Sequence, residues 1–136
     1  MGEQRLRWTG DGLQFLGNAA YGEPLEIGGD TLGRGAKPSD LLPLSLAACT
    51  AYDVVVILRK QRQELRAMEV VTRTTQDPDP PWTFREIHMH FVLTGQVDPA
   101  KAERAVHLAE SKYCSVAATL RDVVSLTLSV EVAAAE

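Results

Sequence analysis

The side chains of this chain that are best suited to redox chemistry are its two cysteines, Cys49 and Cys114. Cys49 follows a stretch of small and apolar residues, and Cys114 lies near the start of a later predicted helix. They lie 65 positions apart, which fits no local metal-binding or redox motif, so any shared chemistry depends on the fold. Two thiols brought together can alternate between dithiol and disulfide, whereas two thiols in a packed core act as small hydrophobic residues. The residues alone leave both interpretations open.

The composition is that of an ordinary globular protein. The 136 residues are 45% hydrophobic and 24% charged, and a chain of this length can bury one core. The net charge of −4, without a basic cluster that includes aromatic residues, argues against binding to nucleic acid. The first residues form no apolar segment of the signal-peptide kind, so we expect a cytoplasmic protein. In that reducing compartment, two cysteines are more often free or catalytic than a structural disulfide.

The first part of the chain, residues 1–37, predicts a meander of short strands. Segments near 5–8, 13–16 and 24–27 are separated by glycine-rich turns. A loop in which Arg34 stands between two glycines then leads to the next element.

A long apolar helix is predicted over about residues 39–63. Ser39 is a suitable N-cap, and the charge of Asp40 suits a first turn. Pro43 either opens the regular helix or marks an irregular first turn. The apolar run is long enough for a membrane span, but Pro43 and Asp53 interrupt it. We therefore interpret it as a buried central helix and expect no contact with a membrane.

The rest of the chain predicts strands within 67–94, helices within 99–122 and a final strand over 123–132. Asp98 suits the N-cap of the first of these helices, and Ser115 that of the second. A helix start at Ser115 would also lower the pKa of the Cys114 thiol. We expect a single α+β domain over 1–136, with antiparallel sheets around the central helix. Because so small a sheet cannot cover that helix, we also expect a homodimer.

The segment around Cys49 resembles the central-helix signature of the OsmC/Ohr family. The matching residues are Pro38, Ser39-Asp40, Leu41-Leu42 and the small-residue stretch that ends at Cys49. The segment Tyr113-Cys114-Ser115-Val116 resembles the family's second cysteine, which also follows an amphipathic helix and precedes a short helix and a last strand. The resemblance covers essentially the whole chain. It implies the OsmC-like fold and an intertwined homodimer with two active sites at the subunit interface.

The resemblance also implies a chemistry, because characterised members of the family reduce organic hydroperoxides with two cysteines. Carried over to this chain, Cys49 is the peroxidatic thiol and Cys114 the resolving thiol. An organic hydroperoxide would be the substrate and an external dithiol the reductant. No metal, haem or flavin cofactor is required.

Cys49 would have to be a thiolate for this chemistry, and its apolar surroundings would raise its pKa. The family's activating group is an arginine oriented by a glutamate, and Arg34 or Arg7 could take this role here. We prefer Arg34, because its glycine-flanked loop can approach a site easily. Ser39 stands where the hydroperoxide-resistance branch has an acidic residue, which leaves Asp40 as a shorter possible orienter. This departure keeps a second function open, an OsmC-fold dimer that binds a small apolar ligand with little or no turnover.

Three other polar features have simpler interpretations. Glu86, His88 and His90 share one face of a predicted strand, which we interpret as a polar face and not a metal site. His107 is expected to be half-buried in packing. Asp53, one helical turn after Cys49, is expected to need a hydrogen-bonding or ionic partner.

Overall fold

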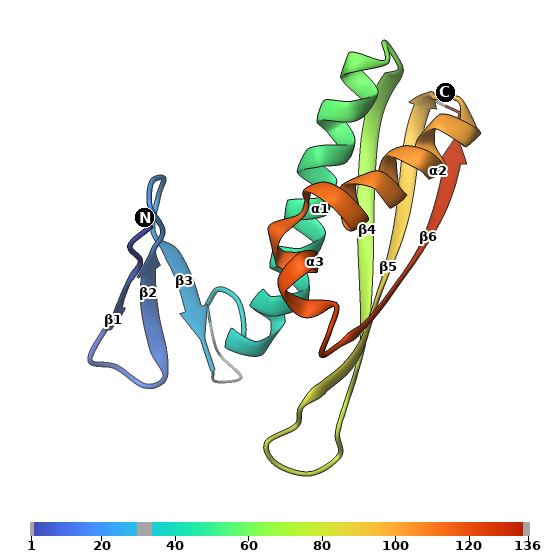
Figure 1. The fold of residues 1–136 in the computed structure, drawn as a ribbon. Coiled ribbons are helices and arrows are strands. Elements are labelled where there is room, and N and C mark those ends of the chain that lie inside the picture. The colour runs from blue at the N-terminus through green and yellow to red at the C-terminus, as the bar shows by residue number, and fades with distance from the viewer. Residues whose placement is uncertain (1, 30–33, 135–136) are drawn as a thin grey trace. The chain divides into compact units, whose positions relative to one another are not determined.

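The computed structural model describes residues 2–29 and 34–134, which fall into two compact units, Met1–Leu42 and Pro43–Glu136 (Figure 1). Two three-stranded sheets and one long helix make up most of the two units, which confirms the predicted α+β class. Gly33, which flanks Arg34 in the predicted loop, lies outside the described residues.

The N-terminal unit holds the predicted meander of short strands. Its strands are β1 (Arg5–Trp8), β2 (Gln14–Asn18) and β3 (Leu25–Gly28), paired antiparallel in the order β1-β2-β3. Glycines with positive φ at Gly10, Gly12 and Gly22 make the turns between them. Gly35 lies against β3 with a φ of 83°, where a Cβ atom would overlap the Glu26 carbonyl group.

The long helix starts irregularly, which is the second of the two predicted roles of Pro43. A 3-10 turn over Pro38–Asp40 leads into α1 (Leu41–Lys60). Lys37 precedes this turn and no side chain caps it, so the prediction that Ser39 is the N-cap is wrong. The physical reason is Pro38, because its fixed φ starts the turn one residue earlier and its ring nitrogen needs no acceptor.

The C-terminal end of α1 has an unusual residue at its turn. Gln63 N–H donates to the Leu58 carbonyl at 2.9 Å and Arg62 N–H to the Arg59 carbonyl at 3.0 Å, the hydrogen bonds of a Schellman motif. Arg62 holds the left-handed position of this motif with a φ of 58°, where glycine is usual. The chain therefore carries local backbone strain at this turn.

The C-terminal unit contains the larger sheet, in the order β4-β5-β6. Its strands are β4 (Glu64–Gln76), β5 (Phe84–Gln96) and β6 (Ser125–Ala133). β4 and β5 form an antiparallel hairpin, but β5 and β6 are parallel, so the prediction of antiparallel sheets is wrong for this pair. The helical segment between β5 and β6 returns the chain to the edge of the sheet where β5 begins, so that β6 can run in the same direction. This segment is the crossover connection that a parallel pair requires.

The crossover between β5 and β6 has three helical pieces. They are α2 (Pro99–Leu108), a π-helical turn (Ala109–Tyr113) and α3 (Ser115–Leu120). Asp98 caps α2 as predicted, since its side chain accepts from Ala100 N–H at 2.9 Å. The N-cap of α3 is Cys114 and not Ser115, because Cys114 is the residue with extended backbone and its Sγ accepts from Ala117 N–H at 3.3 Å.

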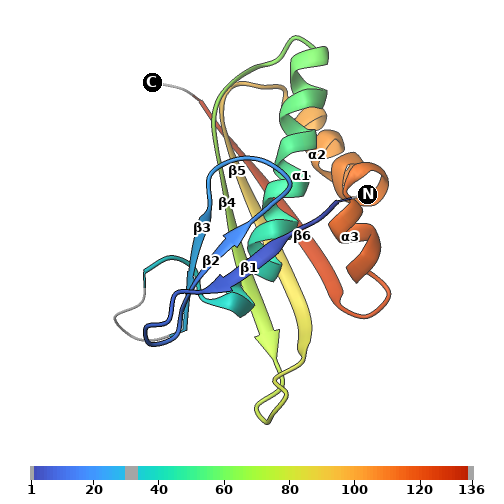
Figure 2. The same cartoon turned by 90° about the vertical axis from the view of Figure 1, so that its left-hand side faces the viewer.

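The core of the C-terminal unit lies between one face of the sheet and the helices, as both views show (Figures 1 and 2). Alternate residues of β5 are fully buried, and so is a stripe of α1 with a spacing of four residues. These residues are Ile87, Met89, Phe91 and Leu93 on β5, and Leu46, Thr50, Val54 and Leu58 on α1. The opposite side of α1 presents Leu44, Ala48 and Tyr52 to solvent. Within the C-terminal unit, helix α1 is therefore buried along one face only.

The segment Pro38–Lys60 is long and apolar enough to cross a membrane. A core helix of a protein without a membrane span meets the same criterion, and α1 has a stripe packed in the core. Its length and composition are therefore weak evidence for a membrane span.

The strain at Arg62 gives a test of this fold. Replacing Arg62 with glycine should raise the free energy of unfolding by about 0.5–1 kcal/mol, because glycine accepts the left-handed conformation without steric cost. Urea unfolding at one fixed protein concentration measures the change. The matched control is Arg59→Gly in the last turn of α1, which should lower the same free energy by about 0.5–1 kcal/mol. Equal effects of the two substitutions would contradict the assigned turn geometry.

Candidate functional site: the thiol pair

The structure brings the two cysteines together in the C-terminal unit. Cys49 lies in the middle of α1, and Cys114 lies between the π-helical turn and α3. Cys49 is partly accessible and Cys114 is 1% exposed, and both are free thiols. The two thiols are close enough for each to shift the pKa of the other, and Cys49 Sγ lies 4.0 Å from Ser115 Oγ.

Small residues allow the segment around Cys114 to pack closely. Ala109 and Ala117, which flank Cys114, are fully buried and belong to the same core cluster as Leu46 of α1. Cys49 packs against the edge of this cluster. The small side chains of the crossover thus allow Cys114 to pack near Cys49.

The chain leaves its helical path at Cys114. Cys114 N–H closes the π-helical turn by donating to the Ala109 carbonyl at 2.9 Å, and its own φ and ψ of −78° and 111° are extended. The next two backbone N–H groups, those of Ser115 and Val116, lie near the thiol of Cys49 and act to lower its pKa. The break in the helix therefore places polar backbone groups beside Cys49.

Burial and the polar neighbours of Cys49 act in opposite directions on its pKa. Burial acts to raise the pKa of the Cys49 thiol, but the Cys114 thiol, the Val116 N–H group and the hydroxyl and N–H groups of Ser115 act in the opposite direction. Together they outweigh burial, so the pKa of Cys49 lies below its ordinary value. Cys49 is thus the more easily ionised thiol of the pair.

Cys114 has the opposite preference. Burial is the main cause that raises the pKa of the Cys114 thiol, and the hydrogen bond to Cys49 and the charge on Cys49 raise it further. Thr50 and the Ala117 N–H group act against this rise. The Thr50 hydroxyl has one hydrogen, which it donates to the Leu46 carbonyl at 2.9 Å, so it offers little help to a Cys114 thiolate. The prediction that a helix start lowers the pKa of Cys114 is wrong for the net shift, because burial outweighs the hydrogen bond from the Ala117 N–H group of that helix.

The predicted activating residues lie in the other unit. Arg7 is an exposed residue of β1, Arg34 is exposed beside a shallow hollow that Glu26 also lines, and Asp40 is exposed in the 3-10 turn. Their action on Cys49 stays a prediction. Within residues 43–134, no arginine or lysine contributes to the lowered pKa of Cys49, and hydrogen bonds take that role.

The contribution of the Ser115 and Val116 backbone N–H groups was not predicted from the sequence. The available signal was the break at Cys114 itself, because the first residues of any helix have N–H groups without helical partners. What the sequence did not indicate was their direction toward Cys49.

A hollow of about 360 Å³ lies between α1 and the C-terminal ends of α2 and the π-helical turn. Asp53, one helical turn after Cys49, and Tyr113, the neighbour of Cys114, both line it. Its other walls are mostly apolar and come from Val56, Ile57, Leu108, Lys60 and Gln61. Neither cysteine lines this hollow, whose apolar walls suit an apolar ligand about one helical turn along α1 from Cys49.

The histidines of β5 lie in a hydrogen-bonded ladder with β6. His88 bonds to Thr127 Oγ1 at 2.7 Å and to Ser129 Oγ at 3.0 Å. His90 bonds to the same Ser129 Oγ at 2.6 Å and to Glu131 Oε2 at 3.3 Å. In residues 2–29 and 34–134, no group of three or more His, Cys, Asp or Glu side chains is arranged to hold a metal ion. The ladder gives these histidines a structural role along the parallel strand pair.

His107 and Asp53 do not have the surroundings that the sequence predicts for them. His107 is exposed and not half-buried, because it points away from the core and pairs with Glu103 at 3.0 Å across one helical turn. Asp53 is partly buried, and the described residues provide it with no hydrogen bond or ion pair. Its side chain is thus available to the hollow.

The comparisons with known proteins agree with this fold. The family model described as OsmC-like protein matches residues 28–129. The chain belongs to the OsmC-like family. Protein YhfA of Escherichia coli K12 is 37% identical over 134 residues, 98% of this chain and 99% of that protein.

Solved structures extend the OsmC-like family assignment to the fold. A hypothetical protein from Aquifex aeolicus VF5 has a TM-score of 0.89 at 30% identity, covering 100% of this chain and 98% of that one. An organic hydroperoxide resistance protein OsmC from Legionella pneumophila has a TM-score of 0.69 at 19% identity, over 96% of each chain. The second likeness shows a shared fold alone.

The hydrogen bond from Cys114 can be tested with two substitutions. Cys114→Ala removes the thiol donor and the cap of α3, so the pKa of Cys49 should rise and its alkylation by iodoacetamide at pH 7 should slow several-fold. Cys114→Ser keeps both a donor and a good N-cap, so its alkylation rate should stay closer to that of the unaltered protein. The rates follow from mass spectrometry of the Cys49 peptide over a range of pH. Identical pH profiles for the alanine variant and the unaltered protein would contradict the assigned interaction.

Proposed function

We propose that this OsmC-like protein reduces organic hydroperoxides with Cys49 as the attacking thiol and Cys114 as the resolving thiol. The observation that supports this most is the unequal pair of neighbouring thiols. Cys49 is accessible and has a lowered pKa, whereas Cys114 is buried and has a raised pKa. Such a pair offers a thiolate for the first step and holds a neutral thiol beside it for the second.

The proposed cycle balances in three steps. The Cys49 thiolate attacks the terminal oxygen of the hydroperoxide, the O–O bond breaks, and the leaving alkoxide takes up a proton to become an alcohol. Cys49 is then a sulfenic acid, which the sulfur of Cys114 attacks, so that water leaves and a Cys49–Cys114 disulfide forms. An external dithiol reduces this disulfide by thiol exchange, and its own two sulfurs become the new disulfide.

The surroundings of the thiols favour an organic peroxide over hydrogen peroxide. The hollow beside Asp53 and Tyr113 has mostly apolar walls, which suit the carbon chain of such a substrate. In this proposal Arg34 or Arg7 assists the attack, and Asp40 orients that arginine. We place the reaction in the cytoplasm, where dithiol reductants are available.

The alternative function is an OsmC-fold dimer that binds a small apolar ligand with little turnover. Ser39 favours it, because the resemblance implies an acidic residue at that position in the hydroperoxide-resistance branch. The pair of neighbouring free thiols favours the peroxidase.

One equivalent of cumene hydroperoxide separates these functions. The reduced protein should consume the peroxide and gain a Cys49–Cys114 disulfide, which intact-mass and peptide mass spectrometry detect. Cys49→Ser should abolish the consumption, while Cys114→Ser should leave Cys49 to oxidise further to sulfinic acid. Survival of both thiols with the peroxide unspent would refute the peroxidase proposal and favour ligand binding.

We also propose that the protein is a homodimer. Leu44 and Tyr52 on α1 are 57% and 72% exposed, and with the exposed Ala48 between them they follow the same spacing of four residues as the buried stripe on the opposite side. A second copy of the chain would remove this apolar stripe from water.

Charge on the exposed stripe of α1 should weaken this dimer. Leu44→Glu places a carboxylate in the proposed interface, so sedimentation velocity should show a shift from dimer toward monomer with a dissociation constant raised at least tenfold, about 1.4 kcal/mol. Val123→Glu is the control, since Val123 is 72% exposed but lies in the turn before β6. A monomeric unaltered protein at micromolar concentration would refute the proposed assembly.

A further inference from the structure

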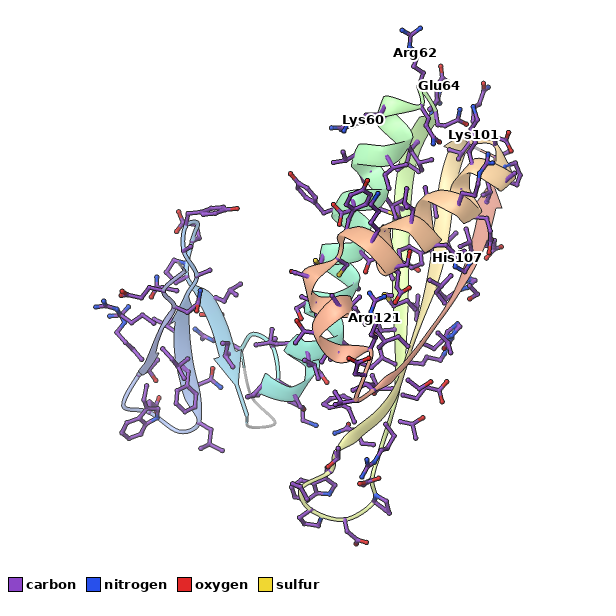
Figure 3. All side chains as sticks on the ribbon, in the orientation of Figure 1. Lys60, Arg62, Glu64, Lys101, His107 and Arg121 are labelled. Carbon is purple, nitrogen blue, oxygen red and sulfur yellow. The ribbon has the colours of Figure 1, made fainter. Side chains whose placement is uncertain are left out.

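Arg121 follows α3 and reaches back over the segment that carries Cys114 (Figure 3). Its guanidinium donates to three backbone carbonyls: Nη2 to Glu110 at 2.7 Å, Nη1 to Ser111 at 3.2 Å and Nε to Ala117 at 3.3 Å. Two of these acceptors precede Cys114 and one follows it. A single planar side chain thus joins the π-helical turn to α3 across the extended residue.

The Glu110 and Ser111 carbonyls need these donors because the helix does not supply its own. In a continuous α-helix they would accept from the N–H groups of Cys114 and Ser115, four residues later. Here Cys114 N–H donates to Ala109 at 2.9 Å, and the extended backbone at Cys114 takes Ser115 N–H out of the helix and near the Cys49 thiol, whose pKa it acts to lower. Arg121 therefore supplies the donors that the break at Cys114 removes from these two carbonyls.

The same contacts fix the position of Cys114. Ala117 accepts from Arg121 through its carbonyl, while its N–H group donates to Cys114 Sγ at 3.3 Å. The carboxylate of Glu110 lies 3.8 Å from Nη2 and balances the charge of Arg121. These two side chains are 35% and 19% exposed, so both partly leave water to make the contact.

We propose that Arg121 is a positioning residue of the thiol pair, which keeps the Ser115 and Val116 N–H groups directed at Cys49 by satisfying the carbonyls of the π-helical turn. This inference rests on the proposed function, in which Cys49 reacts as a thiolate. Lysine cannot replace Arg121 in this role, because an ammonium group lacks the planar set of donors that reaches three carbonyls at once.

The test measures the Cys49 thiolate without peroxide. In reduced Arg121→Gln and Arg121→Lys proteins, the alkylation of Cys49 by iodoacetamide is followed against pH by mass spectrometry. Both variants should require higher pH for the same rate, and each unit by which the pKa rises lowers the thiolate fraction near neutral pH about tenfold. If the glutamine variant does not fold by circular dichroism, the lysine variant, which keeps the charge and most of the bulk, carries the test.

The control is Arg85→Gln, which removes another arginine with two hydrogen bonds, to Asp77 at 2.9 and 2.7 Å in the β4–β5 connection. Its Cys49 profile should overlay that of the unaltered protein. A folded Arg121 variant with an unshifted profile would overturn the inference, even where the unaltered protein consumes peroxide. Failure of the unaltered protein to consume peroxide, with a shifted profile in the Arg121 variants, would instead count against the proposed function alone.

Discussion

A backbone N–H group forms one well-aligned hydrogen bond at a time, and the arrangement around the thiols depends on this limit. A continuous helix from α2 to α3 would direct the N–H groups of Ser115 and Val116 to carbonyls of the preceding turn. The extended backbone at Cys114 takes them out of the helix and near Cys49, whose pKa they act to lower. The carbonyls of Glu110 and Ser111, which would accept from Cys114 and Ser115 in a continuous helix, accept from the guanidinium of Arg121. The thiol site and the break in the crossover are thus one structural feature.

The sheet and α1 hold this feature in place. The buried stripe of α1 fixes the rotation of the helix against β5, which turns Cys49 toward the crossover. The parallel pairing of β6 requires the crossover to pass over the same face of the sheet, so Cys114 arrives beside α1. The described C-terminal unit therefore places its two cysteines by packing and topology, with no local sequence motif between them.

The sequence was sufficient for features that depend on local patterns. Alternating residues predicted the strands, Asp98 predicted a helix start, and small residues around Cys49 carried the family resemblance. The pairing direction of β6 could not be predicted, because it depends on the path of the whole crossover. The capping by Cys114 and the donors to Cys49 were missed for a similar reason, since they follow from where one helix breaks in space. The roles of Arg7, Arg34 and Asp40 remain predictions from the resemblance, because these residues belong to the N-terminal unit.

The donors around Cys49 also bear on the thermodynamics of a disulfide between the two cysteines. Hydrogen bonds from Ser115 and Val116 stabilise a thiolate, and a sulfur in a disulfide carries no such charge to accept them. The cap that Cys114 provides to Ala117 would weaken for the same reason. Both effects favour the dithiol, so they raise the reduction potential of the pair toward that of oxidising thiol proteins. A dithiol would therefore open a disulfide at this site more easily than it would open the same disulfide without these contacts.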